Sequence, residues 1–199
     1  TPPAPNTTSD DIVRTMTVSV AGGNSREVTL TQFAAGSGGD TKGIYTSMSQ
    51  FIPASTSTTD RYYPSNSTID GQPATGFKLG TSSLAGVFTS EALGASLTGD
   101  KKLSFYAVAW TGKAATVYIR VNNGGAVSGA DNHAITASAG ATGSGNDFTF
   151  TDVTDSDYYT FQLTGLTAAS TVTISTSPDF TAASDRNTGR AIVLGVQVY

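Results

Sequence analysis

The stretch Leu103–Asn122, LSFYAVAWTGKAATVYIRVN, decides the fold class of this 199-residue chain. Side chains of a β-strand point alternately to two faces, so each half of the stretch has an odd-numbered and an even-numbered side. The odd side is apolar in both halves, and the even side combines aromatic and polar residues. We expect two neighbouring antiparallel strands, with Trp110 opposite Thr116 and the odd side buried.

Further strands are expected on both sides of this stretch, separated by Gly-rich turns and without a helical period. They are predicted at 12–20, 27–32, 77–79, 86–90, 135–138, 147–150, 158–163, 171–176 and 190–199. In the last strand, Ile192, Leu194, Val196 and Val198 are expected to point inward. Residues 44–52 fit either a strand or a helical turn, and 53–72 is predicted as a long polar loop. This spacing indicates an all-β fold, a two-sheet antiparallel β-sandwich.

The first ten residues are rich in proline and threonine and are predicted to form an extended tether. A tether of this kind follows a cleaved signal or a lipid anchor upstream of Thr1, which favours an exported protein; an interdomain linker has the same composition. Residues 11–199 are expected to form a single sandwich domain, within which 11–75 can be an N-terminal elaboration.

Composition excludes several classes of protein. Only 13% of residues are charged, the net charge is −4, and no Lys/Arg cluster occurs in the sequence, which argues against nucleic acid and against an anionic membrane surface as partners. No apolar run is long enough for a transmembrane helix. The absence of cysteine excludes disulfides, cysteine-ligated zinc and a thiol nucleophile.

From Gly76 onward the chain carries GFKLGTSSLAGVFTSEALG, LTGDKKLSFYAVAWTGKAATVYIRVN, FTFTDVTDSDYYTFQLTGL, TVTIST and RAIVLGVQVY. In this order the segments resemble the jelly-roll, galactose-binding-domain-like modules of Bacteroidetes surface lipoproteins. The resemblance implies a jelly roll and an extracytoplasmic protein, either at the cell surface as an outer-membrane lipoprotein or secreted. The chain departs from that pattern at Leu194-Gly195, where the family often has an acidic or amide pair, and its first 75 residues have no counterpart.

Nothing in the sequence indicates catalysis. His133 is the only histidine, and no G-x-S-x-G motif is present for a Ser-His-Asp triad. The aspartates fall in predicted turns, where they cap the backbone, and no pair is set apart for glycoside hydrolysis. We therefore expect a non-catalytic protein, and a glycan-processing hydrolase or its accessory is a remote alternative.

Aromatic residues make glycan the expected ligand class, because aromatic rings stack on sugars and polar side chains read hydroxyl groups. The even side of the central stretch supplies Tyr106, Trp110, Tyr118, Arg120 and Asn122, with Tyr106 expected opposite Arg120. Tyr62 and Tyr63 in the long loop are further candidates, either for the ligand or for anchoring the loop. Alternatively, other segments cover these rings. The chain is then a structural or adhesive module that contacts other surface proteins and has no small-ligand site.

One acidic run suits a hard cation. Asp152, Asp155 and Asp157 lie within six residues, and carboxylate oxygens are the ligands that calcium prefers. The run lacks the glycine and terminal glutamate of an EF-hand, and it also fits a turn with exposed acids. A structural calcium ion is the one cofactor that the sequence suggests.

Overall fold

The computed structural model describes residues 12–18, 26–32, 45–110, 114–135, 142–150, 155–182 and 189–199. The chain divides into two compact units, one ending at Lys42 and the other spanning Gly43–Val198. The first unit contains the antiparallel hairpin of β1 (Ile12–Val18) and β2 (Arg26–Gln32), which confirms the predicted hairpin. The predicted tether lies outside the described residues.

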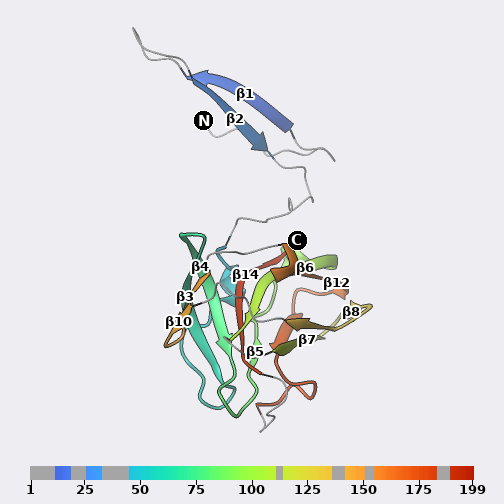
Figure 1. The fold of residues 1–199 in the computed structure, drawn as a ribbon. Helices are drawn as coiled ribbons and strands as arrows, with labels where there is room; N and C mark the ends of the chain where they lie inside the picture. Colours follow the sequence, from blue (N-terminus) through green and yellow to red (C-terminus); the bar gives the residue numbers. More distant parts are fainter. Residues whose placement is uncertain are drawn as a thin grey trace. The chain divides into compact units, whose positions relative to one another are not determined.

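The second unit is a sandwich of two sheets, which confirms the predicted all-β class (Figure 1). The larger sheet has the order β10-β11-β3-β4-β14-β6-β12-β8, and the smaller has the order β5-β13-β7-β9. All pairs are antiparallel except β11–β3. The strands of the larger sheet are β3 (Tyr62–Ile69), β4 (Gln72–Leu79), β6 (Gly99–Ala109), β8 (Ala126–Ser128), β10 (Thr142–Ser144), β11 (Asp147–Phe150), β12 (Tyr158–Leu166) and β14 (Ala191–Val198). Those of the smaller are β5 (Val87–Thr89), β7 (Ala115–Asn122), β9 (Asn132–Ile135) and β13 (Thr171–Ser175).

The described helical structure consists of three short 3₁₀ turns, η1 (Ser49–Phe51), η2 (Ala95–Leu97) and η3 (Asp155–Asp157). The first of them resolves the ambiguity at 44–52, where the chain forms a helical turn and not a strand. Phe51 in this turn is fully buried in the main core.

The predicted pairing of β6 with β7 is wrong, because the two strands belong to different sheets. β6 lies between β14 and β12, whereas β7 lies between β13 and β9. The predicted buried side is nevertheless correct, since Phe105 and Ile119 are 0% and 1% exposed and share one core. The alternating pattern defines which face of a strand is buried, but two strands on opposite sides of a core carry the same pattern as two neighbours.

A β-bulge in β14 reverses which residues of the strand point to which face of the sheet. The register with β6 shifts between Leu194 and Gln197, and Gly195 there has φ 62°. Before the bulge, Val193 points into the main core; after it, Val196 and Val198 do. The prediction that Ile192 and Leu194 point into the same core as Val196 and Val198 is therefore wrong, because an extra residue reverses the alternation of faces. Ile192 and Leu194 lie instead in a second apolar cluster.

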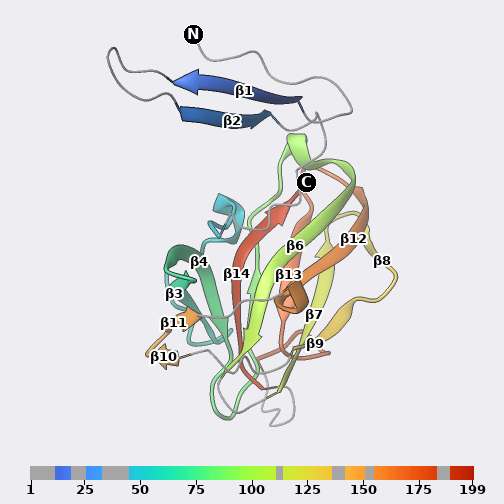
Figure 2. The same cartoon turned by 45° about the horizontal axis from the view of Figure 1, so that its top comes forward.

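This second cluster covers the outer face of the larger sheet. It contains Ile69, Ala74, Tyr106, Val108, Phe148, Phe150, Ile192 and Leu194, with Tyr45, Trp110 and Tyr158 packed against it. Figure 2 shows β11 and β10 beside β3, at the edge of the sheet that carries Phe148 and Phe150. A void of about 10 Å³ between Ile69, Tyr106 and Phe150 has room for about one water. The outer face is therefore packed where β11, β3, β4, β14 and β6 contribute to this cluster, whereas Thr160 and Gln162 of β12 are exposed.

The predicted loop at 53–72 is wrong from Tyr62 onward, where the chain forms β3. Pro64 weakened the strand signal, yet it does not interrupt the ladder with β4. The amides of Asn66 and Asp70 donate to Asp147 Oδ1 and to the Phe150 carbonyl, away from β4. Pro64 is also an even-numbered residue of β3, so its ring nitrogen faces away from β4. The missing N–H group of Pro64 therefore removes no hydrogen bond between β3 and β4.

Candidate functional site

Strand register gathers four polar and aromatic side chains at one end of the outer face. Directly opposite residues of neighbouring strands share a face, and Lys78 of β4 is opposite Tyr63 of β3 and Ile192 of β14. Two residues further along, and therefore on the same face, the amide of Trp110 donates to the Arg190 carbonyl at 2.9 Å. We refer to Tyr63, Lys78, Trp110 and Arg190 as the Trp110 cluster.

Both cations of the Trp110 cluster lie over the indole ring. The Cζ atom of Arg190 is 4.7 Å from the ring centroid of Trp110, and the Nζ atom of Lys78 is 5.0 Å from it. The same Nζ atom lies 4.7 Å from the ring centroid of Tyr63 and donates to the Gly145 carbonyl at 3.1 Å. The rings therefore fix the positions of the two charges, each cation–π contact contributing about 0.5–1 kcal/mol at an exposed site and more where water is excluded.

The inner edge of the cluster is apolar. The ring of Phe148 meets the indole of Trp110 edge-on, with centroids 4.6 Å apart. All four members of the cluster are half-buried, so each retains a surface that a ligand can reach. The site is thus a partly open end of an otherwise packed face.

Like charges are held together in the cluster. Burial, and to a lesser extent the positive charge of Arg190, lower the pKa of Lys78, and burial lowers the pKa of Arg190. Within the described ranges, no ion pair joins a carboxylate to either cation. The fold therefore concentrates positive charge here in a protein whose formal net charge is −4.

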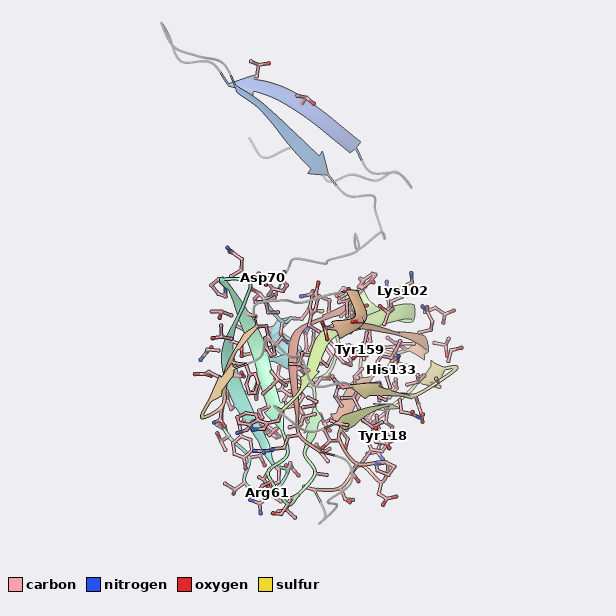
Figure 3. The ribbon with its side chains drawn as sticks, viewed as in Figure 1. Arg61, Asp70, Lys102, Tyr118, His133 and Tyr159 are labelled. Carbon is pink, nitrogen blue, oxygen red and sulfur yellow. The ribbon has the colours of Figure 1, made fainter. Side chains whose placement is uncertain are left out.

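A third positively charged residue, Arg61, lies at the same end of the sheet. Arg61 immediately precedes β3, and its carbonyl accepts a hydrogen bond from the amide of Gly80 at 2.8 Å. Its Nε atom is buried and has no hydrogen-bond partner among the described residues. Figure 3 places Arg61 at the opposite end of the sandwich from Asp70, which directly follows β3. Gly80 has φ 82°, and a Cβ atom there would lie 2.9 Å from the carbonyl oxygen of Leu84, so the chain requires glycine at this turn.

Two other predicted ligand residues are packed against neighbouring rings. Tyr106 is 7% exposed, and its ring lies 5.4 Å from that of Tyr45 and 4.9 Å from that of Tyr158. Tyr62 packs against the main core, with its ring perpendicular to that of Phe88 at 5.2 Å. Of the adjacent tyrosines 62 and 63, the first is therefore an anchor and the second lies in the Trp110 cluster.

The remaining predicted ligand residues lie on the smaller sheet, so the expected pair of Tyr106 and Arg120 does not form. Tyr118, Arg120 and Asn122 all belong to β7, and Figure 3 shows Tyr118 on the side of the sandwich away from β3 and β4. Arg120 is exposed over the ring of Phe180, with Cζ 4.3 Å from the centroid. The side-chain amide of Asn122 donates to the hydroxyls of two threonines of β13.

An open cleft of about 250 Å³ lies between β7 and β8. Its lining includes Arg120 and Asp131, together with Gly125 and Gly129. The cleft has no aromatic side chain in its lining, which makes it a poorer match for a sugar ring than the Trp110 cluster.

The predicted calcium ligands are only partly described. Asp152 lies outside the described ranges, and of Asp155 only the backbone, at the start of η3, is described. Asp157 is 7% exposed; burial, and to a lesser extent the nearby charge of Asp157, raise the pKa of Tyr159. No group of three metal-binding side chains occurs among the described residues. The calcium site stays a prediction.

His133 lies at the surface of β9. Its Nδ1 atom is 2.9 Å from the carbonyl of Ala134, and its ring meets that of Tyr159 at 4.7 Å (Figure 3). Both contacts position the imidazole at the surface of the smaller sheet.

Sequence reasoning missed Lys78 and Arg190, which are far apart in the chain. Lys78 is the single charge within β4, and Arg190 directly precedes β14, which contains no charge. A lone cation in or beside an apolar strand is the signal that could have marked them.

The chain matches no family model, no curated protein and no solved structure. The described part of the chain contains no helix of the length and apolarity needed to cross a membrane.

Proposed function

We propose that this protein is a non-catalytic binding module for polysaccharides, exported to the cell surface or secreted, and that the Trp110 cluster is its binding site. The observation that carries the proposal is the half-buried indole of Trp110 at the open end of a packed face, with two nitrogen donors beside it. Half-exposed aromatic rings with convergent hydrogen-bond donors are typical of sugar sites.

Three features support this site over the other predicted candidates. Tyr106 is covered by neighbouring rings, which leaves little of it to a ligand. The cleft lined by Arg120 lacks an aromatic ring. The Trp110 cluster combines two rings with two donors, and the cation–π contacts hold those donors before a ligand arrives. The jelly-roll resemblance is a further, independent support for a binding module.

Affinity electrophoresis tests this function. The wild-type protein is run through gels that contain neutral or acidic polysaccharides, with Trp110→Ala and, as a matched control on the other sheet, Tyr118→Ala. We expect retardation by at least one polysaccharide, its loss in Trp110→Ala and its persistence in Tyr118→Ala. Trp110→Phe keeps a ring in place if the alanine variant folds poorly, as judged by circular dichroism.

Two results would overturn the proposal. One is migration unaffected by every polysaccharide, which favours the alternative of a structural or adhesive module. The other is a retardation that disappears in Tyr118→Ala and survives in Trp110→Ala, which moves the site to the smaller sheet.

A further inference from the structure

The Trp110 cluster is built around charge more than around an open ring face. Arg190 and Lys78 both lie over the indole, at 4.7 and 5.0 Å from its centroid. A sugar that stacks flat on Trp110 therefore competes with a cation for the ring. A ligand that meets the cations themselves needs no such displacement, so the arrangement favours a ligand group that binds Lys and Arg directly.

Within the described residues, the two cations repel each other without a carboxylate between them. The positive charge of Arg190 contributes to the lowered pKa of Lys78. An anion bound between the two side chains would remove this repulsion, and guanidinium and ammonium groups both form strong charge-assisted hydrogen bonds to carboxylate and sulfate oxygens. The half-buried setting strengthens these interactions relative to a fully exposed pair.

The surroundings add to this preference. Neighbouring rings and the Gly145 carbonyl hold Lys78 in place, so little side-chain entropy is lost when an anion binds. The formal net charge of −4 works against unspecific attraction of polyanions, so binding of an acidic polymer requires a local site.

We infer that the Trp110 cluster selects acidic sugars, with Lys78 and Arg190 binding the carboxylate or sulfate group and the rings of Trp110 and Tyr63 contacting the sugar. This inference rests on the proposed polysaccharide-binding function. It adds to that function a ligand class that the composition of the chain does not suggest.

Pairs of acidic and neutral polymers that share a sugar backbone test the inference by affinity electrophoresis. The pairs are polygalacturonate and its methyl ester, carboxymethyl cellulose and hydroxyethyl cellulose, and dextran sulfate and dextran. We expect the wild-type protein to bind at least one acidic polymer tenfold or more tightly than its neutral partner. Added NaCl is expected to weaken binding of the acidic polymer and not binding of the neutral one. The first two pairs report on carboxylate and the third on sulfate.

Charge-removing variants assign the effect to the cluster. Lys78→Met and Arg190→Met are each expected to reduce affinity for the acidic polymer about tenfold more than affinity for its neutral partner. Lys78→Arg keeps the charge and is expected to retain acidic binding, which a purely structural role of Lys78 would not predict. Lys101→Met, on β6 away from the cluster, serves as the matched control for a change of net charge.

The outcomes separate this inference from the proposed function. Neutral and acidic partners bound equally, or acidic binding that survives both methionine variants in folded protein, would overturn the selection of acidic sugars and leave polysaccharide binding in place. No binding to any of the six polymers or to the wider gel panel would overturn both.

Discussion

The side chains of Lys78 and Arg190 lie over the same indole ring, that of Trp110, although they come from different segments of the chain. Their approach follows from the order β4-β14-β6 in the larger sheet, because Lys78 lies on β4, Arg190 directly precedes β14 and Trp110 directly follows β6. The arrangement costs free energy in the unbound protein, because two positive charges are partly removed from water and set close together.

This cost gives Lys78 a measurable effect on the pH dependence of stability. The pKa of Lys78 is lowered in the folded protein, whereas in the unfolded chain it is near 10.5. Between these two values the unfolded chain binds a proton that the folded protein has lost, so the free energy of unfolding rises with pH in that window. At lower pH both states are charged, and the destabilisation is constant.

Urea unfolding of the wild type and Lys78→Met, from pH 7 to just below pH 10.5, measures this effect. The wild type is expected to gain stability relative to the variant as pH rises toward 10.5. Tyr159, whose pKa is raised, is present in both proteins and cancels in the difference. A difference that stays flat, or that falls with pH, would show that Lys78 is not strained by its surroundings.

A buried hydroxyl holds β11 against the face that carries the cluster. Ser67 Oγ accepts a hydrogen bond from the Phe148 amide at 3.0 Å and lies 2.8 Å from Ser65 Oγ. Ser67→Ala leaves the buried amide of Phe148 without this partner, and we expect a loss of about 1–3 kcal/mol in the free energy of unfolding. Denaturant unfolding measures the loss. The exposed Ser83→Ala is the control, and equal stabilities of the two variants would contradict this role of Ser67.

Gly76 is required by the close approach of β4 and β14. A Cβ atom there would lie 1.9 Å from the carbonyl oxygen of Val193 and 2.9 Å from Cα of Leu194. Both contacts are with backbone atoms, so Gly76→Ala must push the strands apart, and we expect a loss of more than about 2 kcal/mol. Thermal unfolding beside the exposed Gln72→Ala of the same strand measures it. A melting temperature equal to that of the control would show that these strands are not so closely packed.

Engineered disulfides test the assignment of β6 and β7 to different sheets, and the cysteine-free chain makes the result unambiguous. Ser104 and Thr160 are opposite each other on β6 and β12, with hydroxyls 2.9 Å apart. The double variant Ser104→Cys/Thr160→Cys is therefore expected to cross-link on oxidation, because directly opposite strand residues meet the geometric limits of a disulfide.

The contrasting double variant places cysteines at the two positions that the sequence pattern predicted to be opposite each other. Tyr106→Cys/Arg120→Cys is expected to keep two free thiols, since the two side chains lie on the outer faces of different sheets, whose backbones stack about 10 Å apart. Thiol titration after mild oxidation distinguishes the two arrangements. Cross-linking of this second pair without the first would restore the side-by-side hairpin.

Several elements could be predicted from the sequence because local pattern alone determines them. Phe105 and Ile119 lie in alternating apolar runs, and both are buried as expected. The predicted strand at 147–150 coincides with β11. Turn glycines and β-branched residues supply these signals within a few positions, so no distant contact is needed.

Other features depend on contacts that a local pattern does not encode. The partner strands of β6, the bulge at Gly195 and the buried Ser67 of β3 each depend on segments distant in sequence. The residues of the candidate site likewise divide into those that the sequence marks and those that only the fold brings together. Trp110 and Tyr63 were recognisable as aromatic candidates, whereas Lys78 and Arg190 join them only through the strand order.

Trp110 is the only tryptophan in the chain, so its fluorescence reports on the cluster directly. The decisive measurement is a titration of that emission with a short oligomer of galacturonic acid, beside its methyl ester and beside Lys78→Met. We predict a saturable change with the acid oligomer that is at least tenfold weaker with the ester and with the variant. Emission that does not change at concentrations where the acidic polymer retards the protein in a gel would contradict the placement of the binding site at Trp110.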